Sequence, residues 1–455
     1  MKSKRIIAVV TSVVLVAAVI LLPVAASSRN SGCGCGQVLQ VWVDGFGQPL
    51  FWEEGTADEL VQGPLRFDEI LPNVPAFLRG ALNTVASVRL REPFIDFDPL
   101  AQGISELAQG VLGHLQMDEF GQSVYPISAR WVIDPDQCHT EEPEFWFRFD
   151  YRQCPYVVAS ELNEFIETLV EQTGHQSVAL TSHSQGGVIA MTYLAVYGSD
   201  RLDTLILANS GWQGLGLVGQ LFTGQFTLSG ESLAAFTGLG LLEHDAVASL
   251  ISYVSNFISN ALMEPLFEHF ITPVLVQMPA VWAFVTEEYF SQAVAQFSDN
   301  PAMADLLATA TRHHNEVMLR MEYLITQAMA NGTHVAVIAS YGNPSIPVTP
   351  GQLHHGDSIL ETHRKSGGAT VAPFGKTLPA GEGRHRSPDN IIDASTAMLP
   401  DNTWFVYANG HNPNTMHDLR MWIIHADVQP TVWQNPAFPQ FLRNPGEGGQ
   451  AVPLG

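Results

Sequence analysis

Residues 177–190 read SVALTSHSQGGVIA, and this stretch decides the fold. An apolar, β-branched run leads into Ser184, and two glycines and an apolar run of helical composition follow directly. This order predicts a strand, a sharp turn and a helix, with the serine held on the strained turn between them. The residues two before and two after such a serine must be small, and Ser182 and Gly186 meet that demand, although glycine is usual at the first position. The sequence therefore predicts Ser184 as a nucleophile, with an ordinary strand–helix junction as the alternative.

A serine on such a turn needs partners, because its hydroxyl is a weak nucleophile until a base removes its proton. It also needs N–H groups that stabilise the oxyanion formed in the reaction. The backbone N–H of Gln185, at the start of the helix, is one predicted donor. Residues 44–50, DGFGQPL, follow an early apolar run and contain glycines that let backbone N–H groups turn inward. We expect the second donor to be the N–H of Phe46, with a plain glycine turn as the alternative.

The composition describes a globular, acidic protein. Of 455 residues, 46% are hydrophobic and 15% are charged, so the chain can bury one large core or two smaller ones. Asp and Glu number 45 against 21 Lys and Arg, which gives a formal net charge of −24. This charge argues against nucleic acid and anionic surfaces as partners, and it favours a neutral or zwitterionic substrate.

The N-terminus has the pattern of an export signal. A basic start, MKSKR, precedes an apolar run at residues 6–26 that ends in the small residues Val24-Ala25-Ala26. This pattern predicts a signal peptide over residues 1–26, with cleavage after Ala26. The run is also long enough to span a bilayer, so a retained anchor is the alternative. In both cases we expect an exported protein, either secreted or held in the cell envelope.

The four cysteines fit an oxidising compartment. Cys138 and Cys154 flank a mid-chain loop and are the expected disulfide, which would contribute about 3 kcal/mol in a chain-entropy model. Cys33 and Cys35 lie near the expected mature N-terminus, and their pairing stays open. No third or fourth metal ligand lies near them in the sequence, and no metal or other cofactor is expected.

Apolar runs and turn signals divide the chain into a core, two insertions and a tail. The expected core strands are residues 38–43, 145–149, the run before Ser184, 204–208, 334–339 and 404–408, with a helix at 161–173. The expected units are a first core part at 37–214 with a lid insertion at about 53–136, a helical cap at 215–330, a second core part at 331–434 and a tail at 435–455. The Pro- and Gly-rich tail is expected to be peripheral or disordered.

The expected cap is rich in apolar residues, and residues 241–275 are dense in Leu, Phe, Ile and Val. Helices that are apolar on more than one face must bury the second face against something. Over an active site, a fatty substrate can fill that role, so the cap points to lipid. Packing of these residues within the cap is the alternative.

In a serine hydrolase of the α/β-hydrolase type, the acid and the histidine follow the nucleophile, each on a loop after a late strand. Asp357 follows a glycine and precedes Ser358 and an apolar pair, and it is the expected acid. A metal site formed by Asp357 with His354 and His355 is the alternative, but adjacent histidines seldom direct both rings to one ion.

Two histidines follow the last expected strand, and either could accept the Ser184 proton while Asp357 holds its tautomer. We favour His417 as the base, because Leu419 and the apolar run at 421–424 fit a packed segment after the histidine. His411, which is closer to the strand, is the alternative base.

Several segments, taken in order, resemble the lecithin:cholesterol acyltransferase-like family of lipases and acyltransferases. They are VDGFGQPL at 43–50, FDYRQCP at 149–155, NSGWQG at 209–214, MPAVW at 278–282 and GDSI at 356–359. The chain differs from the family pattern at Asp44, Ser182 and Ser358. The resemblance implies an α/β-hydrolase fold, with a mostly parallel central sheet flanked by helices, a lid insertion and a helical cap. It also implies acyl transfer by Ser184, Asp357 and a histidine, and substrate contacts from Trp212 and Trp282.

The first functional hypothesis is therefore a secreted serine lipase or acyltransferase that cleaves lipid esters through an acyl-enzyme on Ser184. Such an enzyme would take a lipid or ester substrate and could associate with a membrane or lipid surface. An extracellular hydrolase of short-chain or polymeric esters is a related alternative. The alternative from another class is a non-catalytic, lipid-binding protein of the same fold.

Overall fold

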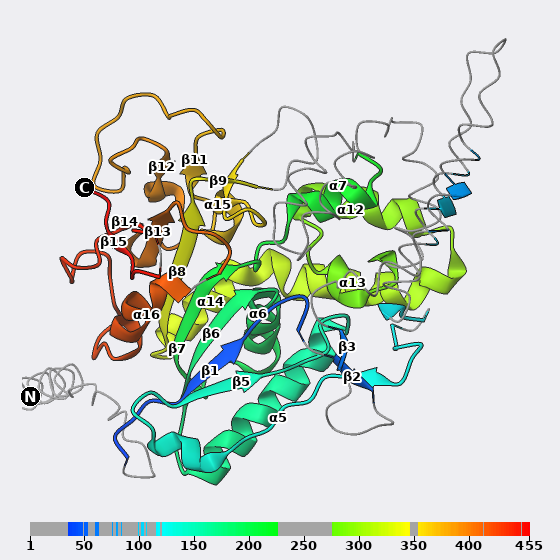
Figure 1. Cartoon of the computed structure of the whole chain (residues 1–455), viewed down its shortest axis with the longest axis horizontal. Coiled ribbons are helices and arrows are strands. Elements are labelled where there is room, and N and C mark those ends of the chain that lie inside the picture. The colour runs from blue at the N-terminus through cyan, green and yellow to red at the C-terminus, as the bar shows by residue number, and fades with distance from the viewer. Residues whose placement is uncertain are drawn as a thin grey trace, which may run out of the picture.

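A mostly parallel, eight-stranded sheet forms the centre of the protein in this computed structural model (Figure 1). Across the sheet the strands are β15 (Val452–Pro453), β14 (Phe441–Arg443), β13 (Thr403–Tyr407), β8 (His334–Tyr341), β7 (Leu202–Ser210), β6 (Val178–Ser184), β1 (Gln40–Val43) and β5 (Glu144–Phe147). All neighbours pair in parallel except β14 and β15, which are antiparallel. The structure describes residues 35–48, 50–52, 60–62, 115–118, 121–225, 275–345, 354–412, 414–446 and 448–455, with a few single helical residues between 75 and 106.

The central strands are buried on both faces, and alternate residues pack against helices on opposite sides. Leu205 and Leu207 of β7 belong to one core cluster together with residues of α5 (Pro155–Thr173), α6 (Gly186–Tyr197) and α14 (Met321–Ala330). Ile206 and Ala208 belong to a second cluster with residues of α16 (His417–Ile424). The period-two alternation of side chains along each strand therefore builds a helix–sheet–helix sandwich.

The remaining elements lie outside this sheet. Strands β2 (Leu50–Trp52), β3 (Leu60–Gln62) and β4 (Ile127–Ser128) form a small separate sheet. Two two-stranded sheets pair β9 (Asn343–Pro344) with β10 (His355–Gly356), and β11 (Thr370–Val371) with β12 (Ile392–Asp393). The other described helices are α7 (Gly216–Phe222), α11 (Pro279–Trp282), α12 (Glu287–Phe297), α13 (Ala304–Glu316) and α15 (Thr362–Lys365), with 3₁₀ turns η3 (Pro135–His139), η6 (Pro301–Met303), η7 (Met318–Arg320), η8 (Ala394–Thr396), η9 (Pro400–Asn402) and η10 (Asn414–Met416).

The expected fold class is confirmed: it is α/β, with a mostly parallel sheet flanked by helices. Each expected core strand coincides with an observed one, and the expected helix at 161–173 is the later part of α5. Within the range expected for the cap, α14 packs against β8 and α6 and so belongs with the helices on the sheet. The densely apolar segment at 241–274 lies outside the described residues, as does most of the expected lid insertion.

The tail, expected to be peripheral or disordered, forms an edge of the central sheet. Its strand β14 pairs with β13 in parallel, and β15 completes that edge of the sheet. Leu442 is fully buried in the cluster that contains α16. Residues 435–455 therefore contribute two strands to the central sheet.

The structure does not show the expected disulfide, since no bond joins Cys138 and Cys154. Cys138 is buried in the core from the turn η3, whereas Cys154 is the N-cap residue of α5. Burial raises the pKa of the Cys154 thiol, and N–H groups of the first helical turn oppose that rise. Cys33 lies outside the described residues, so the pairing of Cys33 and Cys35 stays open.

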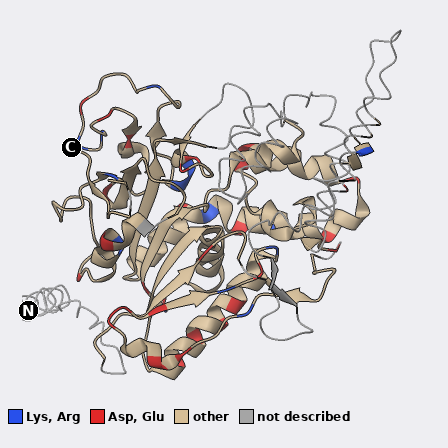
Figure 2. Cartoon of the chain, viewed as in Figure 1, with Lys and Arg blue, Asp and Glu red and all other residues tan. Residues whose placement is uncertain are grey.

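The charge of the surface and the apolar N-terminal run are the features on which the expected partners depend. Asp and Glu side chains are spread over the outer elements, and α5 carries several of them without any Lys or Arg (Figure 2). The expected signal or anchor at residues 1–26 lies outside the described residues. Within the part of the chain that the structure describes, no helix has the length and apolar character that crossing a membrane requires.

Candidate active site

Ser184 lies on a strained turn between β6 and α6. Its φ angle is 51°, in the left-handed region that a residue with a side chain seldom adopts. The turn brings its neighbours so close to adjacent backbone that a Cβ on Gly186 would lie 2.0 Å from the carbonyl oxygen of Val43. A Cβ on Gly45 would lie 2.5 Å from Ser184 Oγ. The glycines of the sequence motif are therefore required by close approach, and the strained turn predicted for Ser184 is present.

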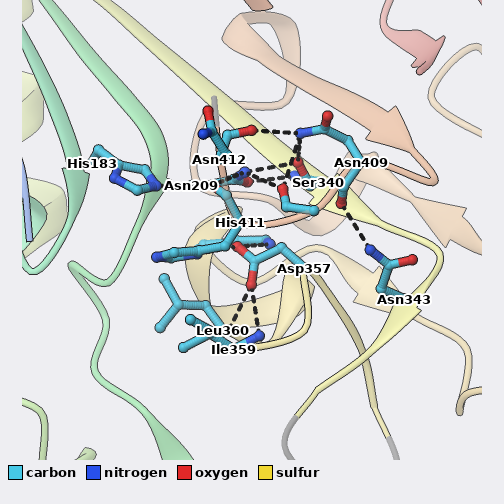
Figure 3. Close-up of polar contacts among 12 residues, drawn as sticks. His183, Asn209, Ser340, Asn343, Asp357, Ile359, Leu360, Asn409, His411 and Asn412 are labelled. Carbon is cyan, nitrogen blue, oxygen red and sulfur yellow. Dashed lines mark hydrogen bonds and ion pairs between the residues drawn. The ribbon is translucent and has the colours of Figure 1, made fainter. Parts of the chain in front are cut away.

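Asp357 and His411 form an acid–histidine pair (Figure 3). Asp357 Oδ2 lies 3.0 Å from His411 Nδ1, and the Asp357 side chain is fully buried. The other carboxylate oxygen, Oδ1, accepts hydrogen bonds from the backbone N–H groups of Ile359 (3.0 Å) and Leu360 (2.8 Å). These bonds fix the plane of the carboxylate, so it presents one oxygen to the imidazole.

A buried lysine also contacts this carboxylate. Lys365 Nζ, on the short helix α15, lies 2.7 Å from Asp357 Oδ2, and both side chains are fully buried. Burial alone would raise the pKa of Asp357, but attraction and hydrogen bonding from Lys365 and His411 hold that pKa well below its usual range. Asp357 is therefore ionised and can hold the His411 tautomer that has a proton on Nδ1.

The histidine of this pair lies beside the serine turn. His183, the residue before Ser184, points Nε2 at the carbonyl oxygen of His411 over 2.8 Å, and the two rings are 4.5 Å apart (Figure 3). Asn209, at the end of β7, donates its amide Nδ2 to the same carbonyl at 3.1 Å. Burial lowers the pKa of His411, and the charge of Asp357 raises it.

The structure brings only one of the two candidate histidines, His411, into contact with Asp357. His417 begins α16, where its side chain is 39% exposed and its Nε2 lies 3.4 Å from Glu142 Oε2. His411, the alternative, is the one that contacts Asp357. Of the apolar residues after His417 that favoured it, Leu419, Ile423 and Ile424 form the buried face of α16, which packs on the sheet.

The loop after β1 lies where the oxyanion donors were expected. The Gly45 N–H donates to Asp44 Oδ1 at 2.8 Å, so that donor is already used. The next residue, Phe46, is 51% exposed, and its ring lies 4.4 Å from that of Tyr151. Gln185 immediately precedes α6, with its side-chain Nε2 donating to the Tyr151 carbonyl at 2.7 Å. Both expected N–H groups thus belong to backbone segments that meet at Ser184.

The two tryptophans expected to contact substrate are packed inside the protein. Trp212 is 0% exposed and Trp282 is 1% exposed. Their indole N–H groups donate to backbone carbonyls, those of Lys365 and Val276 respectively. Both rings are thus buried in the described structure, and substrate contacts from Trp212 and Trp282 stay a prediction.

The histidines considered as metal ligands point to different neighbours. The His354 ring lies against His363, and the His355 ring lies near Phe374 and Tyr341. Among the described residues, no group of three His, Cys, Asp or Glu side chains is arranged to hold a metal ion.

Sequence reasoning missed Lys365 and the contact between Asp44 and His183. The histidine next to the nucleophile was visible in the motif, and Asp44 was visible as a departure from the family pattern. Their Nδ1–Oδ1 distance of 2.8 Å joins residues 139 positions apart, and no local pattern indicates that pairing. Lys365 gives no signal at all, because a lysine in a short polar helix ordinarily faces solvent.

Comparisons with known proteins bear on the fold of the segment around Ser184. A family model described as alpha/beta hydrolase fold matches residues 135–220, the part of the chain that contains β5, α5, β6, α6 and β7. No curated protein matches the chain. Among solved structures, a chain from "The crystal structure of Tle4-Tli4 complex" is similar at 11% identity with a TM-score of 0.30, covering 68% of this chain and 75% of that one. A likeness at that level does not establish a shared function. The family match, the parallel sheet and the serine turn together show that this chain has the α/β-hydrolase fold, which suggests a hydrolase.

Proposed function

We propose that this protein is an exported serine lipase or acyltransferase that cleaves lipid esters through an acyl-enzyme on Ser184. The observation that carries the proposal is the buried Asp357–His411 pair, which lies beside a serine on a strained strand-to-helix turn. Serine, acid and histidine occur in that chain order, as in other enzymes of this fold. His411 replaces His417 as the proposed base because it alone of the two contacts Asp357.

Each residue then has one role in acyl transfer. His411 Nε2 takes the proton from Ser184 Oγ as that oxygen bonds to the ester carbonyl carbon, and Asp357 stabilises the imidazolium. The N–H groups of Phe46 and Gln185 stabilise the oxyanion. The C–O bond to the leaving alcohol breaks as His411 returns the proton to that alcohol. Water or a second alcohol, deprotonated by His411, then cleaves the acyl-enzyme.

The lipid and export parts of the proposal rest on the sequence. The apolar run at 6–26 after a basic start supports export, with a cleaved signal or a retained anchor. The density of Leu, Phe, Ile and Val at 241–275 supports a fatty substrate and contact with a membrane or lipid surface. The resemblance to the lecithin:cholesterol acyltransferase-like family supports transfer to an alcohol as well as to water.

An activity-based probe tests the chemistry directly. A fluorophosphonate reacts only with a serine whose hydroxyl is activated, so the wild-type protein should be labelled on Ser184 and Ser184→Ala should not. His411→Ala should lower the labelling rate and ester hydrolysis by at least about 10³-fold. His417→Ala is the matched control, because it removes a histidine from the same segment without touching Asp357, and it should retain most of the activity.

Three results would contradict the proposal. Folded wild-type protein that is never labelled would favour the non-catalytic, lipid-binding alternative. Labelling at a residue other than Ser184 would show that Ser184 is not the nucleophile. Loss of activity in His417→Ala with retention in His411→Ala would show that the base has been assigned wrongly.

A further inference from the structure

His183 has two hydrogen-bond partners, and both are oxygens. Its Nδ1 lies 2.8 Å from Asp44 Oδ1, and its Nε2 lies 2.8 Å from the backbone carbonyl oxygen of His411. A carbonyl oxygen can only accept a hydrogen bond, and an ionised carboxylate can only accept as well. A neutral imidazole carries one N–H, so it can satisfy one of these partners at a time. Both contacts are satisfied together only by the doubly protonated imidazolium.

The Asp44 carboxyl has a lowered pKa. Burial alone would raise its pKa, but the hydrogen bond and charge of His183, the Gly45 N–H and the charge of Arg148 together lower it. The Asp44 carboxyl is therefore ionised and cannot donate to Nδ1. Its Oδ1 also accepts the Gly45 N–H at 2.8 Å, so this one oxygen binds both the loop after β1 and the residue before Ser184.

The three segments joined in this way are the ones that the proposed reaction uses. Asp44 begins the loop that carries the Phe46 N–H, His183 precedes the nucleophile, and the carbonyl at the far end belongs to the base itself. Asn209 donates to the same carbonyl, so the backbone of the base is held by two side chains. A shift of about 1 Å in such a group can cost about 100-fold in rate.

We propose that Asp44 and a doubly protonated His183 form a bridge that positions the base His411 relative to Ser184 and the oxyanion loop. This inference rests on the proposed function, since it assigns His183 and Asp44 as positioning residues for that same site. The doubly protonated ring of this bridge also places a positive charge beside the base.

The charge of His183 also affects the pKa of His411. The charged and titratable groups around His183 are Asp44 and Arg148 on one side, and His411 with its partners Asp357 and Lys365 on the other. Burial lowers the pKa of His411, Asp357 raises it, and the charge of His183 lowers it further. Because the base must be neutral to accept a proton, the charge of His183 extends activity toward lower pH.

Nitrogen NMR of the wild-type protein tests the bridge without relying on catalysis. With ¹⁵N-labelled histidine, the ring of His183 is assigned as the resonance pair that disappears in His183→Gln. At pH 7 we expect both of its nitrogens to carry protons. A His183 ring with one unprotonated nitrogen at that pH would overturn the proposal, whether or not the protein hydrolyses esters.

Kinetics tests the positioning role. His183→Gln keeps an amide donor without the charge, and Asp44→Asn keeps an acceptor for the Gly45 N–H without the charge. We expect each to lower kcat by about 10- to 100-fold with KM within about twofold, because the loss falls on alignment of the base. His183→Gln should also move the acid limb of kcat/KM to higher pH, since the adjacent cation no longer opposes protonation of His411.

Two matched controls separate this effect from general damage. His385→Gln alters another buried histidine, whose Nδ1 contacts Gln440 at 3.0 Å, and Asp134→Asn alters another carboxylate that accepts a backbone N–H. Both controls should keep the wild-type kcat and pH profile. If His183→Gln behaves like His385→Gln in both measurements, the bridge does not position the base. Absence of activity and probe labelling in the wild type would instead count against the proposed function, while the NMR result would still decide the bridge.

Discussion

Lys365 helps to keep Asp357 ionised, which is the form that holds the His411 tautomer. A carboxylate fully removed from water is costly unless it is paired, and Lys365 supplies a full opposite charge at 2.7 Å. The reverse also holds: burial lowers the pKa of Lys365, and Asp357 opposes that shift. His411 can then gain and lose a proton in the proposed reaction while Asp357 stays paired.

Replacing Lys365 by methionine should make both stability and activity more sensitive to acid. The lowered pKa of Asp357 means that its ionised form stabilises the fold above the unfolded-state value of about 3.9, and that this stability is lost as pH falls below it. Without Lys365 the pKa of Asp357 rises, so Lys365→Met should unfold at higher pH than wild type in an acid titration. Its acid limb of kcat/KM should also move to higher pH.

The loss of stability when one partner is removed is larger for a buried ion pair than for an exposed ion pair. Leaving the buried Asp357 carboxylate without the lysine charge that pairs with it should lower the free energy of unfolding by about 3–5 kcal/mol in urea titrations at pH 7. Arg201→Met is the control, because its ion pair with Glu167 is 2.7 Å long but exposed on both sides, and it should cost at most about 1 kcal/mol. Equal losses in the two variants would show that Lys365 is dispensable to Asp357.

At the level of residues, the sequence predicts the parts of the site that a short local pattern marks. Small residues around Ser184 predict the strained turn, and glycine before Asp357 marks its loop. The choice between His411 and His417 depends on where a helix begins, and apolar residues after His417 fit both a packed loop and the observed helix α16. Contacts such as Asp44 with His183 form only after distant segments come together, so the sequence gives no sign of them.

At the level of elements, the glycines around the serine turn set how closely α6 approaches the sheet. A Cβ on Gly186 would lie 2.0 Å from the Val43 carbonyl oxygen, which is backbone of β1 and cannot rotate away. Gly186→Ala should therefore lower the free energy of unfolding by about 3 kcal/mol, measured by urea denaturation. Gly383→Ala is the matched control, because nothing lies within 4 Å of its Cβ position, and it should change stability by less than about 1 kcal/mol. Similar stabilities for the two variants would contradict this packing of α6.

Long apolar strands were predictable, and short edge strands were not. β6, β7 and β8 are runs of seven to nine residues that are almost wholly buried, and such runs are a strong signal. β14 has three residues and β15 has two, one of them Pro453. Their pairing depends on the exposed edge of β13, and Pro and Gly around them favour a loop when the sequence is read alone.

At the level of the whole molecule, the parallel topology assembles the site. Asp357 and His411 are 54 positions apart, and His183 lies 228 positions before His411, yet all three meet. The serine lies at the carboxyl end of β6, and His411 follows β13, which β7 and β8 separate from β6. Because parallel strands end at the same edge, the loops that follow them converge there, and ligands of open α/β sheets bind at that edge.

The lipase proposal predicts a preference for long acyl chains, because the apolar range at 215–330, which joins β7 to β8, is proposed to pack over the bound chain. Burying a chain there removes apolar surface from water at roughly 0.8 kcal/mol per methylene, so six methylenes contribute up to about 5 kcal/mol before ordering costs reduce it. We therefore expect kcat/KM on p-nitrophenyl esters to rise from acetate to octanoate or longer, measured below the concentration at which micelles form. Ser184→Ala run with each ester corrects for background hydrolysis. A maximum at acetate or butyrate would contradict the lipase proposal and favour a short-chain esterase or depolymerase, because such substrates bury too little apolar surface to need a cap.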